Sequence, residues 1–507
     1  MCRNEENNSE SSNCSFDIRN GKGEKMNNSI MNGIFWTYLE RLCVQSLSFV
    51  TSIILARVLL PEYYGMIAVV TALTSIMSVF VDGGFSSALV QNKNTDNRDF
   101  NTIFVFSLTV SLGFYVILFC TSPLLAKLYK MSDLMMVIRV MAIRLPISSI
   151  NAVQIAYLQK NEQYKVFFKA TIVGTIISAF IGVIMAISGC GVWALVVQDI
   201  ANITIDTIIL NKVSLWKPKL EFSMDRILKM LPYGGKVFLT RLLNNGEQSL
   251  KSMIIGKFFS TSELAYYNKG EYFPGLIITN LNSSLIRVLL PTFAGKQDDR
   301  QEIKRILLKY ISVALFITSP MLFGMAAVAD NLVIIFLGEK WIKAIPFIKV
   351  MSLGMVFRTY ITGCTNALLG IGKSDSILKA SSTVNILSIL YTFTVIIFKL
   401  PLYYIACYSI ISSILCIGIF CKKLKDEFSV AYKEEMMVIL PTIIACIIMY
   451  WVVINVGTCF ENRILALFVE IIVGVFVYIM VALFMKNRGI KNIYEIIKNN
   501  KNHLKCY

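Results

Sequence analysis

Long apolar segments separated by short polar gaps cover almost the whole chain after residue 30. Most of these segments approach or exceed the roughly 20 residues that a helix needs to cross a bilayer. The pattern predicts an all-α polytopic membrane protein of about fourteen transmembrane helices. We place them at residues 34–58, 64–90, 100–122, 134–158, 164–188, 191–213, 230–258, 263–294, 302–328, 342–370, 375–398, 402–421, 436–456 and 463–485.

The stretch LARVLLPEYYG, at residues 55–65, interrupts the apolar pattern between the first two segments. Pro61 has no backbone N–H to donate and stops a helix, and Glu62 then lies near the positive end of the next helix dipole. We interpret the stretch as a corner at the extracytoplasmic end of the first helix. The alternative is a contact with transported cargo.

An internal repeat relates the first apolar segment to the seventh. YLERLCVQSLSFVTSIILAR (38–57) and FLTRLLNNGEQSLKSMIIGK (238–257) align without a gap, so that Arg41 matches Arg241 and Arg57 matches Lys257. The repeat predicts two homologous six-helix lobes related by an axis along the membrane normal. The predicted domains are the lobes at 30–215 and 216–425, followed by two additional helices at 426–486.

The termini differ in composition from the apolar region. Residues 1–29 are rich in Asn, Ser and charge and predict a disordered cytoplasmic tail, while 487–507 predict a basic cytoplasmic tail. The tail at 1–29 lacks the apolar core of a signal peptide, and the sequence does not decide between Met1 and Met26 as the true start.

Charge and composition agree with a membrane location. Hydrophobic residues make up 55% of the chain and charged residues only 16%, compared with about 25% charged residues in soluble domains. The net charge is +17, and Lys and Arg concentrate in the connections that follow the even-numbered segments. By the positive-inside rule, these connections and both termini are cytoplasmic. Because the charge lies in short loops, we expect no nucleic-acid partner.

Signatures of enzymes and cofactors are missing from the sequence. His503 is the only histidine, and the twelve cysteines are scattered without a CxxC pair, which argues against a metal site. The chain has no phosphate-binding loop, HExxH, GxSxG or EF-hand pattern. We therefore expect no cofactor, no metal and no catalytic residue.

Basic residues inside the predicted spans are the main candidates for a binding site. Charges in the bilayer are costly and usually face a cavity or a partner. We expect a cationic, water-filled cavity between the lobes that binds an anionic head group such as a pyrophosphate. The alternative is interhelical hydrogen bonding with snorkelling near helix ends. The candidates are Arg41, Arg144, Arg241, Lys251, Lys269 and Arg287.

Acidic residues inside the spans are candidates for coupling transport to a proton or a sodium ion: Asp82, Asp199, Asp206 and Glu247. Two alternatives stay open. Asp82 lies in DGGFSSA, where small residues favour close helix packing, and Glu247 is placed to pair with Lys251 one turn away. A second small-residue cluster, YGGK at 233–236, is predicted to bend its helix or to line the passage.

Several diffuse motifs together resemble a known family: ERL (40–42), LARVLLPEYYG, FVDGGFSSALVQ (80–91), GVWALV (191–196) and FFSTSELAYYNKGEYFPG (258–275). They resemble the polysaccharide or O-antigen repeat-unit flippases of the multidrug, oligosaccharidyl-lipid and polysaccharide exporter superfamily, nearest the lipopolysaccharide biosynthesis proteins that include the colanic acid exporter. The resemblance covers roughly residues 30–485. The polar head at 1–29 departs from the short N-terminus usual in the family.

This resemblance implies a fold and a function. The fold would be two six-helix bundles in a V with the last two spans appended. The function would be to move an undecaprenyl-pyrophosphate-linked oligosaccharide across the bacterial cytoplasmic membrane by alternating access, in contact with membrane lipids and other polysaccharide assembly proteins. Arg41 and Arg241, with Lys251, Lys269 and Arg287, match the placement of basic residues in the cavities of family members.

Two other functions stay open as alternatives. A multidrug or small-solute antiporter of the same superfamily would need an acidic cavity, whereas the polar faces of the predicted spans are net basic. A membrane glycosyltransferase or polymerase would need a carboxylate pair in an extracytoplasmic loop, and the sequence offers no obvious pair.

Overall fold

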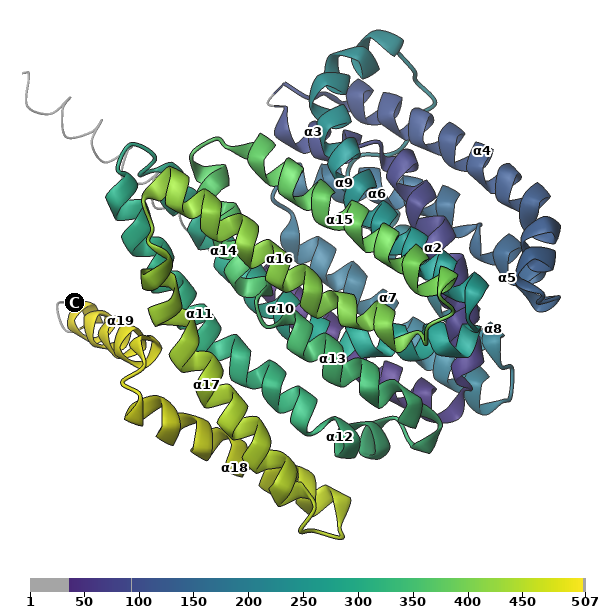
Figure 1. Ribbon diagram of the computed structural model, residues 1–507. Coiled ribbons are helices and arrows are strands. Elements are labelled where there is room, and N and C mark those ends of the chain that lie inside the picture. The colour runs from purple at the N-terminus through teal and green to yellow at the C-terminus, as the bar shows by residue number, and fades with distance from the viewer. Residues whose placement is uncertain (1–35, 93, 505–507) are drawn as a thin grey trace, which may run out of the picture. The chain divides into compact units, whose positions relative to one another are not determined.

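The computed structural model describes residues 36–92 and 94–504, and for residues 283–288, 290, 496, 497 and 499–504 it describes the backbone alone. The regular structure of this part of the chain is entirely helical (Figure 1). The all-α prediction is therefore confirmed. The predicted tail at 1–29 lies outside the described residues, whereas most of the predicted tail at 487–507 forms a helix, α19 (Arg488–Leu504).

Twelve helical segments of the described chain are long and apolar enough to cross a membrane, which makes this a multi-pass membrane protein. They are Trp36–Val58, Pro61–Asp82, Asn97–Tyr129, Asp133–Lys160, Tyr164–Ile187, Val192–Val213, Arg300–Ala327, Glu339–Gly370, Ser374–Ile397, Tyr403–Phe428, Tyr432–Gly457 and Arg463–Phe484. Two further predicted spans form helices of 35 and 34 residues, α9 (Met224–Phe258) and α10 (Thr261–Ala294), that are not among the twelve. Both are rich in polar and charged residues.

The chain divides into two compact units, here called unit 1 and unit 2. Unit 1 holds residues 36–59 and 70–246 of the described chain, and unit 2 holds residues 60–69 and 247–504. Two helices contribute to both units: α2 (Pro61–Asp82) enters unit 1 at residue 70, and α9 leaves it after residue 246.

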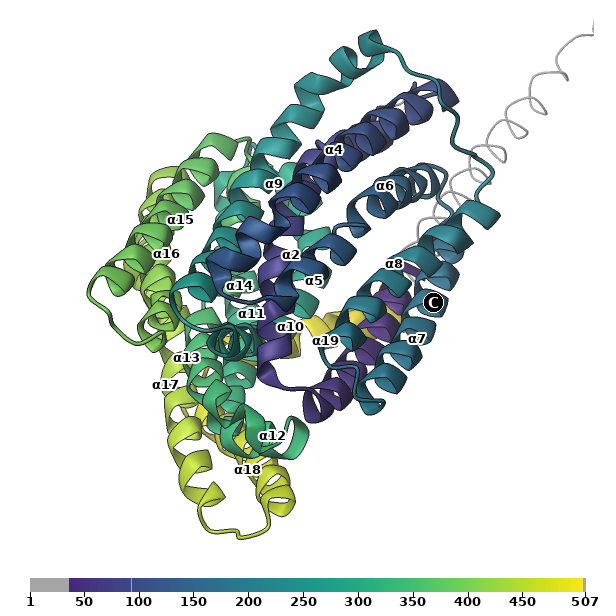
Figure 2. The same ribbon diagram turned by 90° about the vertical axis from the view of Figure 1, so that its right-hand side faces the viewer.

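Unit 1 contains the first described helix, Trp36–Val58, most of α2 and α9, and six further helices. These six are α3 (Phe85–Gln91), α4 (Asn97–Tyr129), α5 (Asp133–Met141), α6 (Arg144–Lys160), α7 (Tyr164–Ile187) and α8 (Val192–Val213). Helices α7 and α8 form an antiparallel hairpin, and α4 packs on α6 (Figure 2). The predicted segment 134–158 is divided into α5 and α6 just before Pro146, where a proline disturbs the preceding turn.

Unit 2 contains α10 and the remaining helices. They are α11 (Arg300–Ala327), α12 (Ala329–Phe336), the 3-10 helix η1 (Glu339–Ala344), α13 (Ile345–Met355), α14 (Arg358–Gly370), α15 (Ser374–Ile397), α16 (Tyr403–Phe428), α17 (Tyr432–Gly457), α18 (Arg463–Phe484) and α19 (Arg488–Leu504). Helices α15 and α16 pack side by side, as do α17 and α18 (Figure 1). A buried carboxylate anchors α17, because Glu435 accepts hydrogen bonds from Tyr360 at 2.7 Å and Cys421 at 2.9 Å.

The stretch LARVLLPEYYG forms a corner, as predicted. The first helix ends at Val58 and α2 begins at Pro61. The matching turn after α9 is equally tight, because α9 ends at Phe258 and α10 begins at Thr261. Each of these two helix boundaries lies 200 positions after its counterpart, Val58 or Pro61. Ser260 caps α10 by accepting a hydrogen bond from the Glu263 backbone N–H at 3.1 Å. The helix ends therefore follow the register of the sequence repeat.

Candidate functional site

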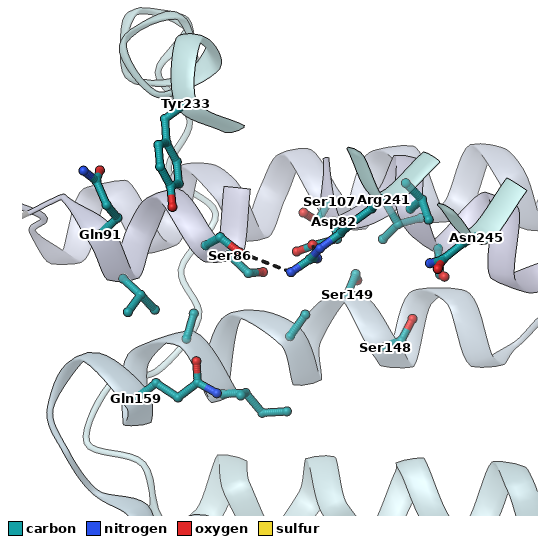
Figure 3. Close-up of a pocket in the computed structure, with 18 residues that line it drawn as sticks. Asp82, Ser86, Gln91, Ser107, Ser148, Ser149, Gln159, Tyr233, Arg241 and Asn245 are labelled. Atoms are coloured by element: carbon teal, nitrogen blue, oxygen red, sulfur yellow. Dashed lines mark hydrogen bonds and ion pairs between the residues drawn. The ribbon is translucent and has the colours of Figure 1, made fainter. Parts of the chain in front are cut away.

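A large cavity lies within unit 1, with a volume of about 810 Å³. Its polar wall consists mainly of serine, asparagine and glutamine side chains, including Ser78, Ser86, Ser107, Ser149, Gln159 and Asn245 (Figure 3). Only two lining residues carry a charge, Asp82 and Arg241. The site is therefore rich in neutral hydrogen-bonding groups around one acid and one base.

The DGGFSSA motif shapes one side of this cavity. Helix α2 ends at Asp82, and Gly83 and Gly84 adopt left-handed φ angles of 52° and 74° before α3 begins at Phe85. Glycine is the residue that adopts such angles without a steric penalty. The break allows Asp82 on α2 and Ser87 on α3 both to reach the guanidinium of Arg241.

The YGGK motif of α9 packs directly against this break. A Cβ atom on Gly84 would overlap the carbonyl oxygen of Gly234, so the two backbones are in contact. Arg241 follows Gly234 by seven residues, or about two helical turns. The two small-residue motifs singled out in the sequence thus meet, and their contact positions Arg241 at the cavity.

Arg241 makes two interactions there. Asp82 and Arg241 lie next to each other at the cavity (Figure 3), and Nη1 of Arg241 forms an ion pair with Oδ2 of Asp82. The Nη2 atom of Arg241 donates a hydrogen bond to Oγ of Ser87 at 3.2 Å. The side chain of Arg241 remains 45% exposed, whereas that of Asp82 is 15% exposed. Oδ1 of Asp82 is buried without a hydrogen-bond partner in the described chain. The guanidinium retains further N–H donors for a ligand.

The other basic candidates of unit 1 lie elsewhere. Nη1 of Arg144 contacts both carboxylate oxygens of Asp199, at 2.6 and 2.7 Å, and neither residue lines the cavity. Arg41, on the first described helix, is exposed and does not line it either. Asp206 packs against α7, where a Cβ on Gly174 would overlap its Oδ1 atom. Of these candidates, the described cavity brings together only Arg241 and Asp82.

In unit 2, Lys251 and Glu247 pair on one face of α9. Nζ of Lys251 lies 2.6 Å from Oε1 of Glu247, the i,i+4 pairing left open by the sequence. The hydroxyl of Ser388 donates to the same oxygen at 2.5 Å. With Glu271 and Arg358, this pair lines a small cavity of about 100 Å³, which has room for a few water molecules.

Lys269 is a packed residue of unit 2. It is 7% exposed, and its ammonium lies 4.9 Å, 5.1 Å and 5.7 Å from the ring centroids of Tyr64, Tyr272 and Trp341. These distances are typical of cation–π contacts. Arg287 belongs to α10, but its side chain lies outside the described residues.

The neutral wall of the cavity was missed by reasoning from charge. Single serines and glutamines are common in membrane helices, so Ser107 and Gln159 carried no signal of their own. A usable signal was the pairing of serines just after residues that disturb a helix, since Ser86 and Ser87 follow the two glycines and Ser148 and Ser149 follow Pro146.

Comparison with known proteins gives a consistent result. The chain is 24% identical over 345 residues to the succinoglycan biosynthesis transport protein ExoT of Rhizobium meliloti, covering 68% of this chain and 70% of that protein. It is 23% identical over 351 residues to the teichuronic acid biosynthesis protein TuaB of Bacillus subtilis, covering 68% and 72%.

Solved structures share the fold. The lipid II flippase MurJ, in an inward closed conformation, superposes with a TM-score of 0.71 at 15% identity, covering 90% of this chain and 99% of MurJ. The sequence model of a family described as polysaccharide biosynthesis protein matches residues 54–346, more than half of the chain. These matches confirm the resemblance noted in the motifs. The chain belongs to the polysaccharide biosynthesis protein family.

Proposed function

We propose that this protein is a flippase that moves undecaprenyl-pyrophosphate-linked oligosaccharide repeat units from the cytoplasmic to the outer leaflet of the bacterial cytoplasmic membrane, for surface polysaccharide biosynthesis. The observation that carries the proposal is the position of Arg241 in a large, hydroxyl-lined cavity of a chain that belongs to this family. The names of relatives support it, since ExoT is a transport protein and MurJ a lipid II flippase.

The cavity has the chemistry that such a cargo needs. A guanidinium binds phosphate oxygens through two parallel hydrogen bonds, which a lysine cannot do. Serine hydroxyls and the amides of Asn245 and Gln159 can donate to and accept from sugar hydroxyls. A volume of about 810 Å³ also lies within the usual range of ligand pockets.

The physical task is to carry a polar head group past hydrocarbon. Each buried polar group without a hydrogen bond costs several kcal/mol, so an uncatalysed crossing is slow. A polar cavity replaces the lost water, while the undecaprenyl tail stays in the lipid. In the alternating-access mechanism that we propose, this cavity opens to each side of the membrane in turn, and Arg241 binds the pyrophosphate in it. A part for Arg41 and Arg287 in binding stays a prediction.

We also propose that α9 and α10 cross the membrane, giving fourteen spans. Both helices carry many polar residues, and for this reason they are not among the twelve apolar spans. A helix that lines a water-filled passage can carry such residues. The lobes would then be 30–215 and 216–425, with the pair of helices at 426–486 appended and both termini in the cytoplasm. This division is supported by the helix boundaries, because the turn between the first helix and α2 and the turn between α9 and α10 lie 200 positions apart, as the sequence repeat does.

Coupling to a proton or a sodium ion stays a prediction. Asp82, Asp199 and Glu247 each pair with a basic residue, so each carboxylate would have to exchange that partner for the ion during transport. An interaction with other polysaccharide assembly proteins likewise stays a prediction.

The test is transport by the purified protein in proteoliposomes. A fluorescent undecaprenyl-pyrophosphate oligosaccharide is incorporated, and its transfer between leaflets is followed by quenching from outside. We expect Arg241→Gln to slow transfer at least about tenfold, because one charge-assisted contact is lost. The matched control is Arg305→Gln, which removes an exposed arginine paired with Glu302. Equal transfer by wild type and Arg241→Gln would contradict the proposal.

A further inference from the structure

The cavity of unit 1 is far larger than a pyrophosphate group. Its volume of about 810 Å³ is typical of a pocket that encloses a whole drug-sized ligand. The two charged residues that line it, Asp82 and Arg241, form one ion pair and account for only part of the wall. The rest of the wall is therefore available to another part of the cargo.

Three exposed side chains from three helices lie together at one end of the cavity, and we call them the Tyr233 cluster (Figure 3). Gln91 is the last residue of α3, Gln159 is the last but one of α6, and Tyr233 comes from α9. Lys160 holds the ends of α3 and α6 together, because its ammonium donates a hydrogen bond to the carbonyl oxygen of Asn92 at 2.5 Å. The two glutamines therefore lie on neighbouring helix ends.

We propose that the Tyr233 cluster is a carbohydrate subsite, which binds the first sugar rings of the cargo while Arg241 binds the pyrophosphate. This inference rests on the proposed function and concerns the same cavity. Arg241 follows Tyr233 by eight residues on α9, which is about 12 Å along the helix axis. A short oligosaccharide attached to a pyrophosphate spans that distance. The sugars then extend from Arg241 toward the ends of α3 and α6.

The groups of the Tyr233 cluster match the surface of a sugar ring. The side chain of Tyr233 is 42% exposed, and its ring offers an apolar face for the C–H groups of a sugar, with a hydroxyl at its tip. Each glutamine amide has a donor and an acceptor, so it can bind two neighbouring sugar hydroxyls. None of the three side chains carries a charge. The cluster therefore fits a neutral polyol better than it fits a phosphate.

A simpler role for Tyr233 is that of an anchor in the membrane interface, where tyrosines are common. Such an anchor would stabilise the helix in the membrane, but its removal would act equally on cargo with and without sugars. The two roles therefore differ in one measurable quantity, which is the gain in affinity that the sugars provide.

Binding to the full-length protein in a neutral detergent tests the inference, with affinities from native mass spectrometry. One probe is undecaprenyl pyrophosphate, and the other is the undecaprenyl-pyrophosphate-linked repeat unit extracted from the bacterium that makes this protein. Wild type is expected to bind the glycosylated lipid at least about tenfold more tightly. Tyr233→Ala should weaken the binding of the glycosylated lipid about tenfold and leave that of the bare lipid unchanged. Gln159→Leu should act in the same direction, because it removes an amide at similar volume.

Two control variants accompany these measurements. Tyr233→Phe keeps the aromatic ring and should keep most of the preference for the glycosylated lipid. Tyr404→Ala removes a tyrosine of unit 2 that is 44% exposed and does not line this cavity, so both affinities should stay as in wild type.

The outcomes separate the two proposals. If Arg241→Gln binds undecaprenyl pyrophosphate as wild type does, the proposed pyrophosphate site is wrong. If Arg241→Gln loses binding but Tyr233→Ala and Gln159→Leu keep the wild-type ratio of the two affinities, the site stands and the carbohydrate subsite is overturned. Equal binding of both probes by wild type overturns it as well. If Tyr233→Ala does not fold, Gln91→Leu and Gln159→Leu decide, and an unchanged ratio in both overturns the inference.

Discussion

The backbones of Gly84 and Gly234 touch, since a Cβ on Gly84 would overlap the carbonyl oxygen of Gly234. Four residues before Gly84, the ring of Phe80 packs edge-on against Phe238, with centroids 5.2 Å apart. These contacts fix the α2–α3 break against α9 in unit 1. The ion pair between Asp82 and Arg241 depends on this crossing, because one partner comes from each side of it.

Gly84→Ala should therefore damage the site without touching a charged residue. At φ 74°, alanine costs about 1–2 kcal/mol in backbone strain, and the overlap with Gly234 adds to it. We expect lower thermal stability in detergent, measured by the unfolding midpoint, and a loss of transport in proteoliposomes.

Gly235→Ala is the matched control, because a Cβ there has nothing within 4 Å outside its own helix. That substitution should be neutral or slightly stabilising, since alanine favours the helix by about 1 kcal/mol over glycine. Equal transport by the Gly84→Ala and Gly235→Ala variants would show that the crossing does not position Arg241.

Replacing Lys269 tests whether it serves mainly in packing. In Lys269→Met, the apolar stem is kept and the cation–π contacts with Tyr64, Tyr272 and Trp341 are lost. Desolvated contacts of this kind contribute about 2 kcal/mol, so the unfolding midpoint should fall. The control is Lys343→Met, at an exposed lysine of the same unit. Binding of undecaprenyl pyrophosphate to the folded fraction should persist. If binding disappears at unchanged stability, Lys269 returns to the binding residues.

A double-mutant cycle tests the pair of Glu247 and Lys251. Glu247→Gln leaves the Lys251 ammonium mostly buried without its carboxylate, which should cost about 3 kcal/mol. The double variant Glu247→Gln with Lys251→Met removes both charges, so much of the stability should return. Transport by the double variant decides the role of Glu247. Transport coupled to an ion gradient as in wild type would exclude Glu247 as the coupling carboxylate.

Much of the fold followed from local signals. Apolar segment length predicted the helices, and Pro61 predicted the corner between Val58 and α2. The breaks at Gly83 and Gly84 and before Pro146 were harder to predict, since the apolar pattern runs on through both. The spans predicted at 230–258 and 263–294 correspond to α9 and α10, which are not among the twelve helices that are apolar enough to cross a membrane, because polar residues dilute their apolar content.

The site was less predictable, because pairing depends on contacts between distant segments. Arg241 and Asp82 were both selected from the sequence as charges in apolar surroundings, but Arg241 was assigned to the substrate and Asp82 to an ion. Only the crossing of α2 and α9 shows that they are partners. The pairing of Glu247 with Lys251 was foreseen, since both residues lie on one helix at i,i+4 spacing.

Labelling of cysteines in intact cells tests whether α9 crosses the membrane. Phe258, the last residue of α9, is 56% exposed, and Phe258→Cys in an otherwise cysteine-free chain offers one reactive thiol. If α9 crosses from the cytoplasm, a membrane-impermeant maleimide should label this thiol without permeabilisation.

The positive controls for this labelling experiment are chains that retain only Cys190 or Cys459. Both are exposed residues in the turns of the α7–α8 and α17–α18 hairpins, which the positive-inside rule places outside. Gln297→Cys, between α10 and α11, should react only after permeabilisation, because that connection is rich in basic residues. The same dependence on permeabilisation at position 258 would place the end of α9 on the cytoplasmic side and reduce the number of spans to twelve.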